Sequence, residues 1–84
     1  MKFKVITSDR AAKEIKKLDK KDRIRIYKEI QRLEDLFSLD IKKIKDRIYR
    51  IRAGKFRIIV EIDFENRIVW VAKVDKRERI YDRI

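Results

Sequence analysis

The chain has 84 residues, enough for one domain with a modest core, so we expect residues 1–84 to form a single domain. Lysine and arginine number 26 against 15 acidic residues, and the formal charge of +11 indicates a polyanionic partner, with nucleic acid as the leading class. Cysteine and histidine are absent, which excludes thiol chemistry, disulfide bonds, zinc fingers and an imidazole base.

The N-terminus lacks the apolar run of a signal peptide, and no segment approaches the roughly 18 apolar residues of a membrane span. We therefore expect a cytoplasmic protein that uses no membrane, metal or cofactor. Charged residues make up 49% and proline is absent, a balance typical of heat-adapted proteins, so we expect a thermophilic source. Hydrophobic residues make up 44% and recur periodically, which favours a folded core over disorder.

The first half of the chain predicts a strand followed by two helices. Residues 1–6 alternate charged and apolar side chains, which predicts a strand with Phe3 and Val5 facing inward. Residues 7–9 can cap a first helix, and Asp22 can cap a second. The apolar stripes of the two helices are Ala11, Ile15 and Leu18, and then Ile26, Ile30, Leu33 and Phe37. We expect an antiparallel helical hairpin joined near residues 19–21.

The second half predicts strands. Residues 38–45 show no sustained period and should cross back to the sheet, after which a period of two predicts strands over 48–53, 56–62 and 67–74. Residues 54–55, with glycine first, and 64–66 form the turns. The predicted class is α+β: an N-terminal strand, the helical hairpin and a three-stranded antiparallel meander, making one twisted sheet with the helices on one face. The expected core is Phe3, Val5, Ile15, Leu18, Ile30, Leu33, Ile51, Ile58, Val60 and either Trp70 or Val71, because the last strand is apolar on both sides.

The predicted hairpin gathers arginines on one face. Antiparallel pairing about residues 54–55 sets Ala53 opposite Phe56, Arg52 opposite Arg57, Ile51 opposite Ile58 and Tyr49 opposite Val60. The apolar face should pack on the helices, and Arg50, Arg52 and Arg57 should project together from the other face. Arginines directly opposite each other destabilise a sheet, and their planar forks suit phosphate, so the cluster predicts an anion site. Ordinary solvated surface charge is the alternative.

The C-terminal segment places Lys76, Arg77 and Arg79 near the aromatic hydroxyl of Tyr81. A tyrosine in this setting can stack on a base or exchange a proton. Its ordinary role is to anchor a chain end by packing, and both interpretations stay open.

The segments YRIRAGKFRIIV (residues 49–60) and VDKRERIY (residues 74–81) resemble two motifs of the RelE/ParE toxin family, in the family's order and with its architecture between them. Lys76 stands where many relatives have histidine, and Val60 stands where they have tyrosine. The closer likeness is to the RelE branch, whose members cut messenger RNA in the ribosomal decoding site and are blocked by a cognate antitoxin. Members of the ParE branch share the fold and poison DNA gyrase.

The resemblance implies an endoribonuclease in which the RNA 2′-hydroxyl attacks the adjacent phosphorus. It assigns catalysis to Arg57, Arg77 and Tyr81, and RNA binding to Arg50, Arg52, Lys76 and Arg79. The implied partners are the ribosome, messenger RNA and an antitoxin whose acidic or amphipathic segment covers the basic face or displaces the C-terminal tail. The alternatives are a non-enzymatic gyrase inhibitor, a general RNA-binding module and an inactive relative.

Overall fold

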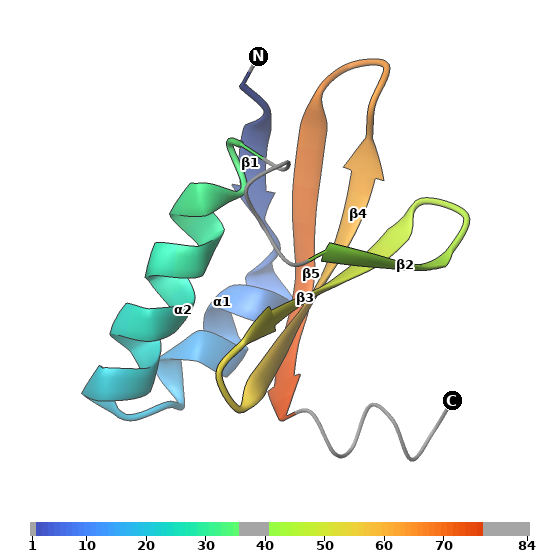
Figure 1. Ribbon diagram of the computed structural model, residues 1–84. Coiled ribbons are helices and arrows are strands. Elements are labelled where there is room, and N and C mark those ends of the chain that lie inside the picture. The colour runs from blue at the N-terminus through green and yellow to red at the C-terminus, as the bar shows by residue number, and fades with distance from the viewer. Residues whose placement is uncertain (1, 36–40, 77–84) are drawn as a thin grey trace.

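The computed structural model describes residues 2–35 and 41–76, with the backbone alone at residue 76. The elements in chain order are β1 (Lys4–Thr7), α1 (Asp9–Lys16), α2 (Lys20–Arg32), β2 (Ile41–Lys45), β3 (Ile48–Ala53), β4 (Phe56–Asp63) and β5 (Ile68–Lys76). The five strands form one sheet in the order β1-β5-β4-β3-β2. Both helices lie on the same side of the twisted sheet, and the other side, called the open face below, carries neither helix (Figure 1).

The predicted α+β class is confirmed, but the sheet is larger than predicted. Strand β1 pairs in parallel with β5, so the N-terminal segment joins the last strand of the meander. An additional edge strand, β2, pairs antiparallel with β3 over a segment for which the sequence predicted only a crossing connection. The sheet is therefore mixed, with the predicted meander β3-β4-β5 at its centre.

Each helix begins at a side chain that caps its free N–H groups. The Ser8 hydroxyl accepts a hydrogen bond from the Ala11 N–H at 3.0 Å and caps α1, as the hydroxyl pattern predicts. The prediction that Asp22 caps α2 is wrong, because the cap is Asp19, whose carboxylate accepts the Asp22 N–H at 3.0 Å. The helix therefore begins one turn earlier than predicted.

One hydrophobic cluster fills the space between the helices and the sheet. Of the predicted core, these residues are buried: Phe3, Ile15, Ile30, Leu33, Ile51, Ile58, Val60 and Val71. Val5 and Leu18 are partly buried and pack against this cluster. Of the two candidates on β5, Val71 is the buried one and Trp70 is only half-buried. Phe37 lies outside the described residues.

A bulge in β5 explains why that strand is apolar on both sides. Val60 pairs with Val71 whereas Ile59 pairs with Lys73, so Ala72 is an extra residue between two paired positions. Side chains alternate between faces, so one extra residue reverses the alternation beyond it. Val69 and Val71 face the core before the bulge and Val74 faces it afterwards.

Helix α1 satisfies backbone groups around this bulge. The Ser8 hydroxyl donates to the Ala72 carbonyl at 3.0 Å, and the Val74 N–H donates to the Glu14 carboxylate at 2.9 Å. Because buried backbone groups need partners, these two bonds stabilise the irregular strand and fix α1 against it.

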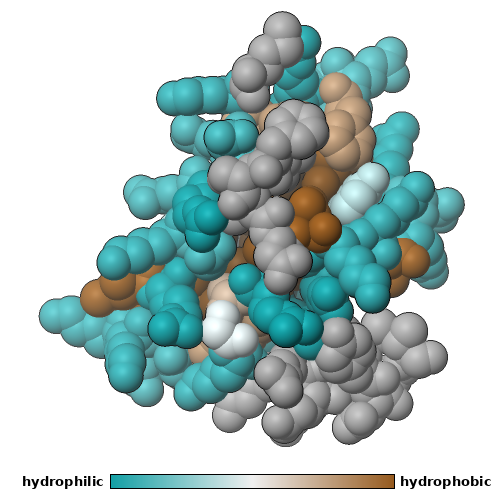
Figure 2. Space-filling model, viewed as in Figure 1, coloured by the Kyte–Doolittle hydropathy of each residue, from teal (hydrophilic) through white to brown (hydrophobic). Residues whose placement is uncertain are grey.

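The hairpin turn at Gly54 and Lys55 matches the prediction. Gly54 has φ of 62°, and Lys55 is not among the residues with positive φ, as a turn with glycine first requires. Hydrophilic residues cover most of the described surface seen in Figure 2. No helix within the described ranges is long and apolar enough to cross a membrane.

Candidate nucleic-acid interface

The register of the β3–β4 hairpin is the one that the sequence predicts. Arg52 lies opposite Arg57, Ile51 opposite Ile58, Tyr49 opposite Val60 and Ala53 opposite Phe56. Directly paired residues share a face, and so do residues two apart on one strand. Arg50, Arg52 and Arg57 therefore lie together on the open face, while Ile51 and Ile58 are buried on the helix side.

The three arginines differ in exposure, which the sequence did not predict. Arg52 is exposed, whereas the exposed fraction is 9% for Arg50 and 0% for Arg57. The predicted common face is therefore confirmed, and Arg52 is the one exposed member of the three. Arg57 lies on β4, which has strands on both sides, so neighbouring side chains can enclose it, whereas Arg52 lies near the end of β3.

Strand β5 adds a carboxylate and a further cation to this surface. Asp75 lies directly opposite Arg57, and Lys73 lies opposite Ile59, two positions further along β4. The Lys73 ammonium is 4.0 Å from the Asp75 carboxylate. A carboxylate at the position opposite a buried guanidinium offsets part of the cost of burying that charge by Coulomb attraction. Neither β5 residue was predicted as part of the site, because their place depends on the bulge at Ala72.

Half-buried apolar side chains, Trp70 and Ile59, also lie on the open face. Trp70 pairs with Glu61 on β4 and with Ile6 on β1, and Ile59 pairs with Arg50. The face is therefore part basic and part apolar. Phe56 is buried and Tyr49 is half-buried against the core, so neither presents a free ring of the kind that stacks bases.

The C-terminal part of the predicted site is not described. Lys76 ends β5, and its backbone is paired with Phe56. Arg77, Arg79 and Tyr81 lie outside the described residues. The roles assigned to them beside Arg57 stay predictions.

Comparison with known proteins agrees with this architecture. Residues 5–81 match the family model of the ParE toxin of the type II toxin-antitoxin system parDE. A protein of Methanocaldococcus jannaschii that carries the name RelE1 is 33% identical to this chain, with 96% of the chain and 97% of that protein covered.

Two solved structures show the same fold. One is the archaeal RelE–RelB complex from Pyrococcus horikoshii, with 22% identity, a TM-score of 0.80, and 94% of this chain and 99% of that chain covered. The other is the RelB–RelE antitoxin–toxin complex from Methanococcus jannaschii, with 29% identity, a TM-score of 0.72, and 94% and 98% covered.

Fold and site together define a small α+β protein with a basic open sheet face. The chain belongs to the RelE/ParE family of toxins from type II toxin-antitoxin systems.

Proposed function

We propose that this protein is a toxin that cuts messenger RNA on the ribosome. The observation that carries the proposal is the placement of Arg50, Arg52 and Arg57 on one face, within the segment that resembles the RNase branch of the family. Guanidinium groups are suited to phosphate because they stay charged and donate from a planar fork.

In the proposed reaction the 2′-hydroxyl of the RNA loses its proton and its oxygen forms a bond to the adjacent phosphorus. The bond from phosphorus to the 5′-oxygen breaks, and this oxygen takes up a proton from solvent, which leaves a 2′,3′-cyclic phosphate and a 5′-hydroxyl. Extra negative charge develops on the phosphate in the transition state, and we assign its stabilisation to Arg57 and Arg77. Tyr81 acts as the general base or as a stacking platform. Arg50, Arg52, Lys76 and Arg79 hold the RNA backbone. No cofactor or metal takes part.

The burial of Arg57 adds a condition to this mechanism. Arg52 is exposed and can contact the RNA first, whereas Arg57 has no exposed surface and can reach a phosphate only after its surroundings rearrange. A guanidinium in a site that excludes water acts more strongly on a phosphate than one in solvent. Binding to the ribosome in the cytoplasm is the step that we expect to open the site.

Cleavage of a messenger RNA on programmed ribosomes tests the proposal. Arg57→Ala should lower the rate by about a hundredfold or more, the usual loss when one transition-state donor is removed, and Arg77→Ala should do the same. Arg47→Ala removes the same charge from an exposed position in the β2–β3 turn and serves as the matched control. Equal rates for Arg47→Ala and Arg57→Ala would contradict the assignment of Arg57.

Tyr81→Phe in the same assay decides the role of the tyrosine. The substitution keeps the ring and removes the hydroxyl, so it costs about a hundredfold or more if Tyr81 transfers a proton. An unchanged rate would leave the stacking role alone.

The second candidate function is inhibition of DNA gyrase without chemistry, because the matching family model describes a ParE toxin. A supercoiling assay with purified gyrase separates the two functions. Loss of supercoiling by wild-type protein that cuts no messenger RNA would replace the nuclease proposal by this one.

The proposed partner in both cases is a cognate antitoxin, since both solved relatives named above are complexes with RelB. An acidic or amphipathic segment suits a chain of charge +11. If it covers the basic face, affinity should fall with added salt. The covering model would be contradicted by a complex whose affinity does not depend on salt and in which the exposure of Arg52 and Arg57 is the same as in the free protein.

A further inference from the structure

A hollow lies between α2 and the β3–β4 turn, on the helix side of the molecule. Its volume is about 390 Å³, and its lining residues are Lys21, Ile24, Arg25, Lys28, Glu29 and Gly54. An adjoining hollow of about 220 Å³ shares Lys21 and Arg25 and adds Asp22 and Lys55. We call the two together the α2 cleft. It shares no residue with the arginine cluster of the open face.

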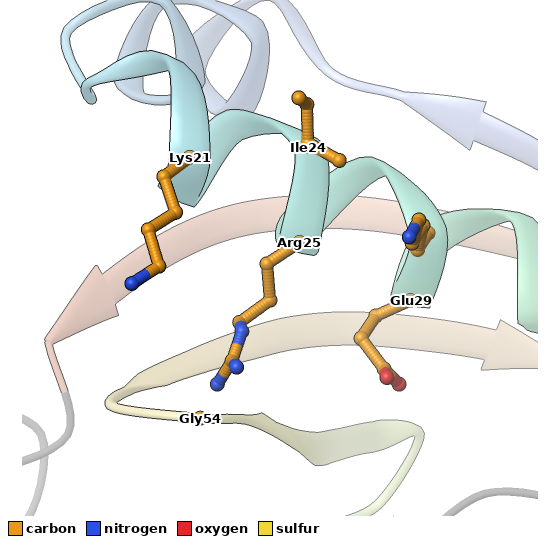
Figure 3. Close-up of a pocket in the computed structure, with 6 residues that line it drawn as sticks. Lys21, Ile24, Arg25, Glu29 and Gly54 are labelled. Atoms are coloured by element: carbon orange, nitrogen blue, oxygen red, sulfur yellow. The ribbon is translucent and has the colours of Figure 1, made fainter.

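Two basic side chains of α2 extend across the α2 cleft toward the β3–β4 turn. Lys21 and Arg25 point from successive turns of α2 toward Gly54, while Ile24 points away from it (Figure 3). The Arg25 guanidinium lies so close to Gly54 that a Cβ at this position would collide with it. Gly54, whose φ is 62°, is therefore required for two reasons: it adopts the backbone conformation of the turn, and its lack of a side chain leaves room for the Arg25 guanidinium.

The carboxylates of the α2 cleft already have cationic partners. Asp22 pairs with Lys55 at 3.4 Å, and Glu29 pairs with Arg32 at 3.1 Å. In contrast, Lys21, Arg25 and Lys28 form no ion pair with any residue in the described part of the chain. The three cations thus share the α2 cleft with two carboxylates that are paired with other cations, an arrangement that an external anion would stabilise.

We propose that the α2 cleft binds phosphates of an RNA backbone, as a contact separate from the arginine cluster. This inference rests on the proposed function in taking RNA as the ligand. A protein segment fits less well, because protein interfaces have an apolar centre, and the one aliphatic lining residue, Ile24, points away from the turn. Lysine and arginine that track a phosphate backbone need no such centre.

The two basic surfaces meet at the β3–β4 turn. Arg52 is two residues before Gly54 and lies on the open face, whereas Arg25 reaches Gly54 from the helix side. One RNA strand that passes over the turn can therefore contact both surfaces. The α2 cleft would hold the backbone while the arginine cluster acts on the phosphate to be cut.

Salt-dependent binding of a mixed-sequence, 2′-O-methylated RNA oligonucleotide tests this inference, because such an RNA binds but cannot be cut. The triple variant Lys21→Gln, Arg25→Gln, Lys28→Gln should lower the slope of log affinity against log salt by about 2, since each phosphate contact to a single strand contributes about 0.7. The matched control is Lys13→Gln, Lys16→Gln, Lys17→Gln, which removes the same charge from exposed positions on and just after α1.

A slope change confined to the α2 triple variant supports the inference, and equal changes in the two triples would overturn it, since net charge would then explain both. Thermal melting checks that the variants are folded. If the α2 triple variant does not fold, the double variant Lys21→Gln, Lys28→Gln should still lower the slope by about 1.4.

Two further arms separate the alternatives. Loss of affinity for a poly-glutamate peptide with an unchanged RNA slope would assign the α2 cleft to a protein partner and overturn the RNA proposal. Cleavage on ribosomes is measured in parallel with wild-type protein. If wild-type protein cuts no messenger RNA but the slope changes as expected, only the nuclease proposal is contradicted. If wild-type protein is active but the slope does not change, only the proposal of RNA binding at the α2 cleft is contradicted.

Discussion

The two faces of the sheet enclose side chains of opposite character. On the helix side, Ile51, Ile58 and Val60 are buried in an aliphatic core. On the open face, the same strands bury Arg57 completely and Arg50 almost completely. Burying aliphatic groups stabilises the fold, whereas burying a guanidinium costs free energy unless partners compensate. The comparison indicates that the helix side supplies most of the stability of the fold, while the open face carries the arginines to which we assign RNA binding and catalysis.

Adjacent positions on β4 give the largest expected contrast in stability. Ile58 is fully buried on the helix side, and Ile59 is half-buried on the open face. Ile58→Ala should lower the free energy of unfolding by about 3 kcal/mol through lost burial and a cavity. Ile59→Ala should cost about 1 kcal/mol. Urea denaturation measures both, and equal losses would break the distinction between the faces.

The two paired arginines sharpen the comparison within the open face. Arg57→Ala should lower the free energy of unfolding by about 2 kcal/mol, because truncating a buried charged side chain removes its packing contacts and leaves the polar groups around it without their partner. Arg52→Ala should change stability by less than about 0.5 kcal/mol, because Arg52 is exposed. Thermal melts of the two variants provide the measurement. A larger loss from Arg52→Ala would mean that burial does not govern this face.

Removing the Ser8 hydroxyl, which links α1 to β5, should lower stability less than Ile58→Ala or Arg57→Ala does. Ser8→Ala removes the helix cap and the donor to the Ala72 carbonyl, so we expect a loss of about 1.5 kcal/mol in the free energy of unfolding. Asp19→Ala removes a cap that is exposed and makes no such second bond, and should cost about 1 kcal/mol. The reverse order in chemical denaturation would contradict the coupling of α1 to the bulge.

The smallest effect is expected in the β4–β5 turn, at Asp63 and Asn66. Hydrogen bonds from the Asn66 side chain and then from its backbone N–H lower the pKa of Asp63 below its ordinary value. A lowered pKa stabilises the fold above the unfolded-state value of about 3.9, and this contribution is lost as pH falls through the folded-state pKa. The stability difference between wild-type protein and Asn66→Ala should therefore shrink on acidification. A difference that grows toward low pH would contradict the assigned cause.

The sequence predicts the fold wherever apolar alternation runs without interruption. The hairpin register and the inward side of β3 and β4 follow from such alternation, and the helix stripes follow from the period of 3.6 residues. The prediction fails at two bulges. In β2, Ile44 is an unpaired residue between Lys43 and Lys45, and it interrupts the period of two. In β5, Ala72 is likewise an unpaired residue between Val71 and Lys73.

The candidate site was predicted in part for a related reason. Alternation places Arg50, Arg52 and Arg57 on one face, but it carries no information on what encloses Arg57. The α2 cleft was missed because it joins α2 to a turn that is distant in sequence, and helical periodicity assigns Lys21 and Arg25 only to a solvated surface.

The bulge at Ala72 also sets the electrostatics of the arginine cluster. With the pairing of Val60 and Val71 continued without an extra residue, Arg57 would face Val74, and Lys73 would face Ile58 in the core. The single inserted residue instead brings Asp75 opposite Arg57 and moves Lys73 to the open face. The bulge thus changes the residue opposite Arg57 from Val74 to Asp75 without any change of sequence. An irregularity of the backbone has here the same effect on the surroundings of the guanidinium as a substitution of valine by aspartate.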